Sequence, residues 1–399
     1  MKYSSYQTDI PIAFILGKYT TTGIGIVRCL KQKRIPIIWI DSNTKHVGFY
    51  SRYCKGLICP DPKNNAEEYI NFLLKIGEKL NHKGVLFPIR DIEVITILKN
   101  RLKLEKFYHI PFADFSITEK LLNKKIFYKI LEDLNIGFPK TYFPKNLSEV
   151  EKISKKITYP CILKPYHSAI FYLDFNIKLF KAVSEDQLVQ CYKRATSRKH
   201  EVMIQEIVTG NARDMYGLNA YYDKTFKPNG IFMYRRIREW PHEFGNGCFI
   251  EQVNKPELEL IVDGLIKEIN YYGIVDAEFR KDPRDDKFKF IEINPRCWMQ
   301  VCLPANYGIN YPYIAYMDAI GQKFENPIII NENIKYIFMI EDFLSSLKSI
   351  KKGELSIREW IKSYKGKKVY AIFCWSDPLP FFVFLLKNFH LRIKSFNKF

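Results

Sequence analysis

The segment from Phe288 to Arg296 constrains the fold of this chain more than any other, because its apolar and polar residues alternate. It reads Phe-Lys-Phe-Ile-Glu-Ile-Asn-Pro-Arg. A period of two is typical of a β-strand with one covered face, and it places Glu292, Asn294 and Arg296 together on the other face. A carboxylate, an amide oxygen and a guanidinium at one strand end suit a hard cation that bridges phosphate oxygens.

A second strand is predicted just before this one. It covers Gly273 to Arg280, and the polar run from Asp282 to Lys287 reads as the turn between the two strands. The resulting hairpin would place Glu278 opposite Glu292. Either glutamate alone would be explained as a solvated surface residue, but the pair on one hairpin favours a metal site.

Glu278 and the Glu-Ile-Asn-Pro-Arg run resemble the metal-binding elements of the ATP-grasp ligases, a family that activates carboxylates as acyl phosphates. The resemblance implies that Glu278, Glu292 and Asn294 hold Mg²⁺, with Mn²⁺ as an alternative, against the phosphates of ATP. It also implies the fold class: α/β with α+β elements, in which a Rossmann-like pre-ATP-grasp domain precedes the ATP-grasp fold.

The beginning of the chain predicts a parallel sheet. Two apolar strand patterns, Ile10 to Leu16 and Ile35 to Ile40, flank a helical run that Gly23 and Gly25 open. Arg28 stands where the dinucleotide-binding fingerprint requires its third glycine. This argues against nicotinamide or flavin binding, and it favours glycines that allow a tight turn and close helix packing.

Polar residues at probable strand ends of this first domain are candidates for holding the acceptor substrate. They are Arg52, Arg90 and Asp91, because ligands of α/β sheets gather at the carboxyl ends of strands. Each could equally form a structural salt bridge. The arrangement resembles the pre-ATP-grasp domain.

Two lysines resemble the pair with which the family contacts the phosphates of ATP. Lys124 follows Asn123, and this pair leads into a helical spacing within residues 118–134 that resembles the family's helix, with Asn123 in place of its aspartate. Lys164 ends the apolar strand from Pro160 to Pro165. A lysine delivered by a buried strand immediately before a proline is uncommon, which favours a function for Lys164.

The run from Val202 to Ile207 matches the adenine-binding hinge of the family. Apolar residues would sandwich the base, while backbone groups and Gln205 or Glu206 read its edge. Asp214 is the nearest acid for the ribose hydroxyls.

The glycine-rich loop that covers the phosphates in this family is missing, since no glycine occurs between Gly137 and Gly210. We expect the segment from His167 to Asn176 to cover the site with bulky residues. His167 could supply a side-chain contact in place of backbone donors, or it could be a packed surface histidine.

Arg236 and Arg238 alternate along another strand-like run, so we expect them on one strand face, where they would suit a phosphate or an acyl phosphate. The resemblance implies that these two arginines and Arg296 stabilise the acyl phosphate. The alternative is a solvated basic edge strand that blocks aggregation.

The formal charge of +19 on 399 residues predicts anionic partners such as nucleotides, acidic sugars, nucleic acid or anionic lipid, without choosing among them. No RNA-binding aromatic motif or zinc module accompanies it, so we expect no specific nucleic-acid partner.

The nine cysteines never form a Cys-x-x-Cys pair, which indicates a reducing compartment. No signal-peptide pattern is present, and the longest apolar run, Phe381 to Leu386, is far shorter than the roughly 20 residues of a membrane span. We therefore expect a cytoplasmic protein.

The chain is predicted to contain four segments: a pre-ATP-grasp α/β domain (1–115), an ATP-grasp N-terminal subdomain (116–200), a C-terminal subdomain with the metal site (201–330) and a basic extension (331–399). The extension mixes lysines with aromatic residues. It reads as a packed helix with a cationic outer face or as a peripheral contact with an anionic membrane surface.

The resemblance covers residues 10–320 and implies an ATP-dependent ligase that joins a small-molecule carboxylate to an amine. Amino-acid, peptidoglycan-precursor and surface-polysaccharide substrates all remain open, including an acidic or lipid-linked glycan acceptor, and we expect a homo-oligomer. The alternative function is a non-catalytic protein that binds a nucleotide or an anionic polymer through a degenerate ATP-grasp site. The missing glycine loop supports that alternative.

Overall fold

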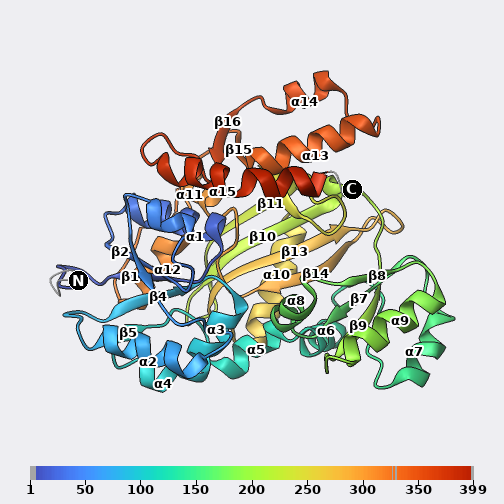
Figure 1. Ribbon diagram of the computed structural model, residues 1–399, viewed down its shortest axis with the longest axis horizontal. Helices are drawn as coiled ribbons and strands as arrows, with labels where there is room; N and C mark the ends of the chain where they lie inside the picture. The colour runs from blue at the N-terminus through green and yellow to red at the C-terminus, as the bar shows by residue number, and fades with distance from the viewer. Residues whose placement is uncertain (1–5, 326, 329, 397–399) are drawn as a thin grey trace.

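A computed structural model of the chain describes residues 6–325, 327–328 and 330–396. Figure 1 shows three sheets with helices around them: a first sheet (blue) at one side, a small sheet (green) at the other, and a large sheet between and above them. The first sheet has five parallel strands in the order β3-β2-β1-β4-β5, which confirms the predicted parallel sheet. The strands of this sheet are β1 (Ala13–Leu16), β2 (Ile37–Asp41), β3 (Lys55–Ile58), β4 (Gly84–Pro88) and β5 (Tyr108–His109).

Helices and a short 3₁₀ turn connect and cover these strands. They are α1 (Thr20–Lys31), the turn η2 (Val47–Tyr50), α2 (Ala66–Gly77), α3 (Asp91–Lys99) and α4 (Arg101–Leu104). The predicted glycines lie inside α1 rather than before it. A Cβ atom on Gly23 would come within 2.1 Å of the Trp39 ring, and one on Gly25 within 2.7 Å of Val301. Both glycines therefore serve the close packing of α1, as the sequence indicated.

The small sheet has four strands in the order β6-β9-β7-β8. They are β6 (Thr141–Tyr142), β7 (Cys161–Pro165), β8 (Phe180–Ala182) and β9 (Val202–Glu206), and the accompanying helices are α7 (Leu147–Ser154), α8 (Ser168–Phe175) and α9 (Glu185–Thr196). This unit has its own hydrophobic core, in which Val150, Leu163 and Leu188 are fully buried.

The large sheet has seven strands in the order β14-β13-β10-β11-β12-β15-β16. They are β10 (Met215–Tyr222), β11 (Pro228–Trp240), β12 (Asn246–Gln252), β13 (Gly273–Lys281), β14 (Phe288–Asn294), β15 (Ile334–Ile337) and β16 (Lys367–Tyr370). The last two strands come from the predicted basic extension, so that segment completes the large sheet. The turn η3 (Ala212–Asp214) and the helices α10 (Pro256–Ile269), α11 (Cys302–Asn306) and α12 (Tyr311–Ala319) belong to the same part of the chain.

The helical spacing over residues 118–134 is divided between two helices, α5 (Phe115–Leu122) and α6 (Lys124–Asp133), and α6 begins at the predicted pair Asn123 and Lys124. The break occurs at Asn123, whose side chain accepts hydrogen bonds from the backbone N–H groups of Lys125 and Ile126. Asn123 thus caps α6, a role in which asparagine is favoured.

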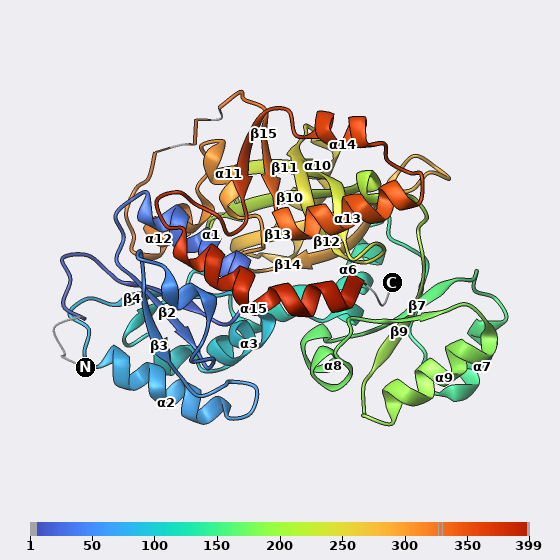
Figure 2. The same cartoon turned by 45° about the horizontal axis from the view of Figure 1, so that its top comes forward.

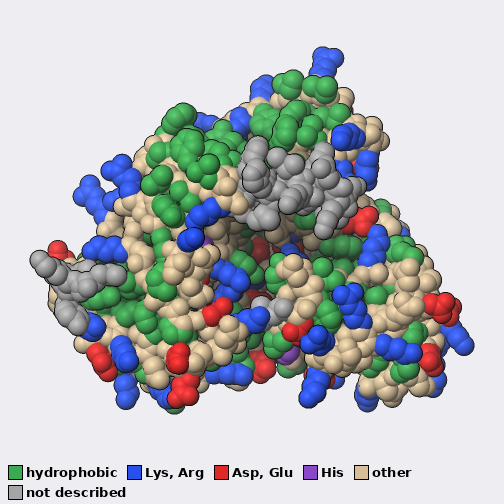
Figure 3. Space-filling view, viewed as in Figure 1, with side chains coloured by type: hydrophobic (Ala, Val, Ile, Leu, Met, Phe, Trp, Pro, Cys, Tyr) green, Lys and Arg blue, Asp and Glu red, His purple; other side chains and the backbone are tan. Residues whose placement is uncertain are grey.

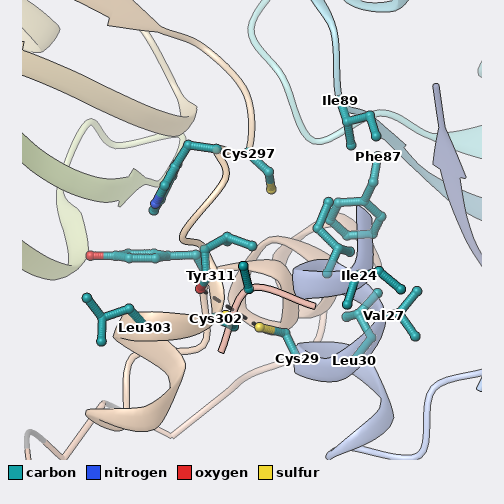
Figure 4. Close-up of a cluster of buried hydrophobic side chains, with 14 of the residues drawn as sticks. Ile24, Val27, Cys29, Leu30, Phe87, Ile89, Cys297, Cys302, Leu303 and Tyr311 are labelled. Atoms are coloured by element: carbon teal, nitrogen blue, oxygen red, sulfur yellow. Dashed lines mark hydrogen bonds between the residues drawn. The ribbon is translucent and has the colours of Figure 1, made fainter. Parts of the chain in front are cut away.

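The first sheet and the large sheet share one hydrophobic core. Buried residues of β1 and α1 join residues of β11 and of the segment that follows β14. Figure 4 shows part of this core, with Ile24 and Leu30 of α1 on one side and Cys302, Leu303 and Tyr311 on the other. A common core fixes the first sheet against the strands that carry the predicted metal site.

Three helices, α13 (Met339–Lys351), α14 (Ile357–Ser363) and α15 (Leu379–Phe396), form the end of the chain. In both cartoon views α15 runs across the front of the molecule beside the first sheet and the large sheet (Figure 2). Within the described residues, no helix has the length and hydropathy needed to cross a bilayer.

Candidate active site

The hairpin of β13 and β14 brings the predicted metal ligands together. The strands pair antiparallel, with Glu278 opposite Glu292 and Asp276 opposite Asn294. The predicted juxtaposition of the two glutamates is therefore confirmed. Side chains of directly opposite residues lie close together on one sheet face.

Glu292 lies among positive charges. Its Oε1 is 3.5 Å from Nζ of Lys124, and its side chain retains 37% exposure, so a ligand can still reach it. Removal from water raises the pKa of this carboxyl, but the charges of Lys124, Lys164 and Lys178 outweigh that effect and lower the pKa to about 2. Glu292 is therefore a carboxylate at any physiological pH.

Lys164 projects from β7 beside the same hairpin. Its Nζ donates to Oε1 of Gln205 at 3.0 Å. Burial and the nearby charge of Lys124 lower the pKa of Lys164 to about 8, while Glu292 and Glu278 act in the opposite direction. Two crowded cations beside two carboxylates are suited to an added anion such as a phosphate group.

Arg236 of β11 contacts the other glutamate. Its guanidinium donates to Oε2 of Glu278 at 2.8 Å, to Glu239 at 3.1 Å and to the carbonyl of Gly245 at 3.0 Å. Arg236 is buried, and the neighbouring carboxylates Glu278 and Glu239 hold its pKa above the usual arginine value despite the cost of burial. Arg236 is thus held beside Glu278, one of the two predicted metal ligands.

Arg238 lies elsewhere, and the expectation that it shares a face with Arg236 was wrong. Arg236 pairs with Ile250 and Arg238 with Phe249, its direct neighbour, because β11 has an irregularity between the two arginines. An extra residue of this kind reverses the alternation of side chains. Arg238 instead donates to Asp342 at 2.6 Å and to Ser363 at 3.1 Å.

Arg296 joins the hairpin to the first domain. Its Nε donates to Oδ1 of Asp91 at 2.5 Å, and its Nη2 donates to Oδ1 of Asn294 at 3.2 Å. Asp91, predicted as an acceptor-substrate contact, is occupied in this ion pair. Arg90 is likewise paired with Glu93, and Arg52 reaches the carbonyl of Ser376 at 3.5 Å, close to the surface.

The donor set on the hairpin fits Mg²⁺. Within the described residues, no three His, Cys, Asp or Glu side chains come together as a metal site. Mg²⁺ does not require such a cage, because one or two carboxylates usually suffice when phosphate oxygens and water complete its shell. Arg236 donates to Oε2 of Glu278, and Nζ of Lys124 lies 3.5 Å from Oε1 of Glu292. The amide oxygen of Asn294 is a further hard donor.

Several solved structures share this architecture. The biotin carboxylase domain of Hydrogenobacter thermophilus 2-oxoglutarate carboxylase, solved with MgADP, aligns with a TM-score of 0.61 and 16% identity over 80% of this chain and 73% of that one. An L-amino acid ligase from Bacillus licheniformis aligns with a TM-score of 0.58 and 12% identity over 81% of this chain and 76% of that one. These likenesses concern the arrangement of the sheets and helices. The chain has the ATP-grasp fold.

The sequence comparison agrees with the ATP-grasp assignment. The chain is 25% identical over 270 residues to D-aspartate ligase from Enterococcus faecium, a match that covers 64% of this chain and 64% of the length of that enzyme. No family model matches the chain.

The residues of the predicted adenine hinge are held by neighbouring groups. Gln205 is buried and donates to Thr141 at 2.8 Å while it accepts from Lys164. Glu206 accepts from the backbone of Lys140 at 2.9 Å and from Arg284 at 3.0 Å.

Asp214 accepts from the backbone N–H of Asn211 at 2.8 Å and completes a capping box in η3. All three side chains are therefore held by neighbouring groups, and the backbone of β9 pairs with β7 and β6.

A helix stands where ATP-grasp enzymes carry their glycine-rich loop. The segment after β7 forms α8, whose preceding residue His167 lies 3.4 Å from Nδ2 of Asn123, next to Lys124. Asp174 near the end of α8 is 2.7 Å from Nε2 of His200, and the buried Phe171 packs against the same imidazole ring. The predicted bulky cover is thus an ordered helix with its own anchor.

Two residues of the site escaped the sequence analysis. Lys178, just after α8, contributes to the low pKa of Glu292 and donates to Asn246 at 3.0 Å. No sequence pattern distinguishes Lys178 from the many other lysines of the chain. Asp276 precedes Glu278 by two positions, so the strand period alone could have placed it on the same face.

Asp276 is a buried carboxyl on β13, opposite Asn294. It accepts from Asn219 at 2.7 Å and from Tyr234 at 3.1 Å. Burial and the neighbouring charge of Glu278 raise its pKa to about 7.

Proposed function

We propose that this protein is an ATP-dependent ligase that joins a carboxylate to an amine through an acyl phosphate. The observation that carries the proposal is the convergence of charged side chains from separate elements on the β13–β14 hairpin. Lys124 comes from α6, Lys164 from β7 and Arg236 from β11, and all three lie beside Glu278 or Glu292. Such an arrangement is suited to phosphoryl transfer, where catalysis rests on positioning and charge neutralisation.

In this proposal each side chain has one task. Lys124 and Lys164 hold the phosphates of ATP, and the hinge formed by Gln205, Glu206 and Asp214 receives the nucleoside. Bound Mg²⁺ would supply Lewis-acid neutralisation of phosphate charge, held by the oxygens of Glu278, Glu292 and Asn294.

The arginines are proposed to act when the acyl phosphate forms. Arg236 lies beside Glu278 and would stabilise the negative charge that develops on the transferred phosphoryl group. Arg296 would hold the edge of the site, because Asp91 and Asn294 fix its guanidinium. Arg238 has no such role in the proposal, since it is committed to Asp342.

The substrates are proposed from chemistry and from the relative. D-aspartate is the first carboxylate to test, because the related Enterococcus faecium enzyme is a D-aspartate ligase. The amine would belong to an amino acid, a peptidoglycan precursor or a glycan. ATP as a substrate and nine free thiols favour the cytoplasm, and the homo-oligomer and the four-segment division stay predictions.

The test is the release of ADP from ATP with panels of carboxylates and amines. The ligase proposal predicts ADP release only when a carboxylate and an amine are both present. Accumulation of a stable phosphorylated product without any amine would contradict it.

A second candidate is a non-catalytic ATP-grasp protein that binds a nucleotide or an anionic polymer. The ordered helix α8 at the place of the flexible loop is the observation that favours it. Nucleotide binding with no ADP release under any substrate combination would support this candidate over the ligase.

A further inference from the structure

The last helix, α15, packs against the protein with only one of its faces. On that face Phe384 is 5% exposed and stacks with Phe338 at a ring distance of 5.6 Å. Phe381 contacts Phe373 at 5.2 Å. These contacts hold the first half of the helix in place.

The opposite face of α15 is apolar too, yet it faces solvent. Leu379, Phe382 and Leu386 are 52%, 53% and 83% exposed, and they follow one another at spacings of three and four residues. Trp375, just before the helix, is 87% exposed. A helix that is apolar all round is normally buried, and large contiguous apolar patches on a surface usually mark an interaction site.

Positive charges border this row of apolar side chains. Lys387 follows Leu386, lies over the Tyr50 ring at 5.0 Å and donates to the carbonyl of Lys45. Next to Trp375, the guanidinium of Arg52 reaches the carbonyl of Ser376 at 3.5 Å.

The same region has little exposed negative charge. Asp377 is 2% exposed and accepts hydrogen bonds from Ser51 and from the backbone of Arg52. From residue 378 to residue 399 the sequence contains no Asp or Glu, whereas it contains four basic residues, Lys387, Arg392, Lys394 and Lys398. Figure 3 shows hydrophobic side chains gathered over this upper part of the molecule, with Lys and Arg side chains at the margin.

We propose that the α15 face, made of Trp375, Leu379, Phe382, Leu386 and Lys387, docks on the surface of an anionic lipid bilayer. Helices that lie in the membrane interface combine leucine and aromatic side chains on one face with lysines beside them. Lys387 and Arg52 place positive charge at the border of the apolar row, although both also contact the protein itself. A protein partner would explain the apolar row but not the one-sided charge around it, which matches the negative potential of an anionic membrane.

This inference stands apart from the proposed ligase activity, because none of the α15 face residues belongs to the candidate active site. Flotation of the full-length protein with vesicles tests it directly. One set of vesicles contains equal parts of phosphatidylcholine and phosphatidylglycerol, and the other contains phosphatidylcholine alone. We expect binding to the anionic vesicles only, weakening as salt is added.

The decisive variant replaces Leu379 and Leu386 by serine. We expect its partitioning onto anionic vesicles to fall by about 10-fold or more, because two leucines no longer enter the interface. The matched control replaces Leu102 on α4 and Leu260 on α10, which are 86% and 76% exposed on other surfaces, by serine. The control should bind vesicles like the unmodified protein.

Three outcomes would overturn the proposal. They are an unmodified protein that ignores anionic vesicles, equal binding to neutral and anionic vesicles, and equal loss of binding in the control variant. The alternative occupant of this face is a second copy of the chain, and light scattering without lipid measures such self-association. If Leu379→Ser and Leu386→Ser abolish self-association but leave vesicle binding unchanged, the face belongs to a second copy and the proposal is overturned. ADP release with soluble substrates should be the same in all these variants, which separates this test from that of the proposed function.

Discussion

Glu292 shows how the charge of one residue is fixed by its surroundings. Lys124, Lys164 and Lys178 keep it ionised although much of its hydration is lost. The same lysines gain a second partner when phosphate groups are bound, so the carboxylate and the phosphates can share one set of cations. The low pKa of Glu292 is thus caused by the lysines around it.

Replacing Glu292 by glutamine should abolish most ADP release and leave the fold intact. The amide keeps the shape of the side chain but removes the negative charge that the metal and Lys124 require. We expect turnover to fall by about 100-fold or more, as is typical when a group that stabilises transferred charge is lost. Steady-state ADP release and a thermal unfolding curve measure the two effects.

Glu268→Gln on the exposed side of α10 is the control, and it should change neither quantity. A Glu292→Gln variant with nearly normal turnover would show that the metal lies elsewhere.

Lys164 should give nucleotide binding an alkaline limit. Its pKa of about 8 means that its charge is lost as pH rises through that value, so ATP affinity should weaken above pH 8. Lys164→Arg should flatten this dependence, because arginine stays protonated. Titration calorimetry between neutral and alkaline pH measures it, with the exposed Lys155→Arg as control.

The effect of Lys164 on stability has the opposite direction. Its folded pKa of about 8 lies below the ordinary value of 10.5, so the unfolded chain binds more protons between these values. Lys164 therefore destabilises the fold below pH 8, and this penalty fades as pH rises towards 10.5.

For the binding experiment, unchanged ATP affinity across pH 8 in the unmodified protein would contradict the assignment of Lys164 to the phosphates.

At the scale of elements, the irregularity in β11 separates a site arginine from a structural one. Arg238 and Asp342 form a pair in which both side chains are almost completely buried. Arg238→Ala leaves that carboxylate without its cation and should lower the free energy of unfolding by about 3 kcal/mol. Chemical denaturation measures this loss.

The neighbouring arginines supply the comparison. Arg235 forms a partly exposed pair with Glu251, so Arg235→Ala should cost less than about 1 kcal/mol. Arg236→Ala should abolish turnover, whereas Arg238→Ala should keep its turnover at temperatures where it is folded. Equal loss of turnover in both variants, with no loss of stability in Arg238→Ala, would contradict this division.

The sequence predicted elements best where a strand pair is closed by a short local turn. Glu278 and Glu292 could be placed opposite each other because a polar turn joins two adjacent strands, although the pairing of β13 with β14 has an irregularity between Glu278 and Phe279. Arg238 could not be placed, since the irregularity in β11 has no mark in the sequence. The start of α6 at Asn123 and Lys124 agrees with the resemblance, whereas the separate helix α5 was not predicted, because the apolar spacing continues through the break.

At the scale of the whole molecule, the small sheet and the large sheet contribute different parts of the candidate site. The small sheet has its own core, and Met203 of β9 also packs into the core of the large sheet. Lys164 and α8 belong to the small unit, and the acidic hairpin belongs to the large one. A nucleotide bound between them would therefore contact both units.

Amide hydrogen exchange in α8 should show whether a bound nucleotide contacts the small unit. With a non-hydrolysable ATP analogue and Mg²⁺ bound, the amides of residues 168–175 should exchange more slowly, because the helix begins beside Lys124 and would cover the phosphates. Amides of α2 in the first domain should not change. Unaltered exchange in α8 alongside proven nucleotide binding would show that this helix takes no part in enclosing the phosphates.

The order of the sheets and the hairpin could be inferred from the sequence, because strand patterns and turn residues are local. Contacts between distant segments could not be inferred. The Arg296–Asp91 pair joins residues that are 205 positions apart, and Lys178 reaches Glu292 only after α8 has folded in place of a loop.

The most direct test of the central claim follows oxygen from the carboxylate to the released phosphate. A carboxylate that supports ADP release together with an amine is prepared with heavy oxygen in its carboxyl group, and the phosphate is analysed by mass spectrometry. Formation of an acyl phosphate predicts that each released phosphate carries one heavy oxygen from the substrate. Phosphate without the label, at full turnover, would contradict the ligase mechanism.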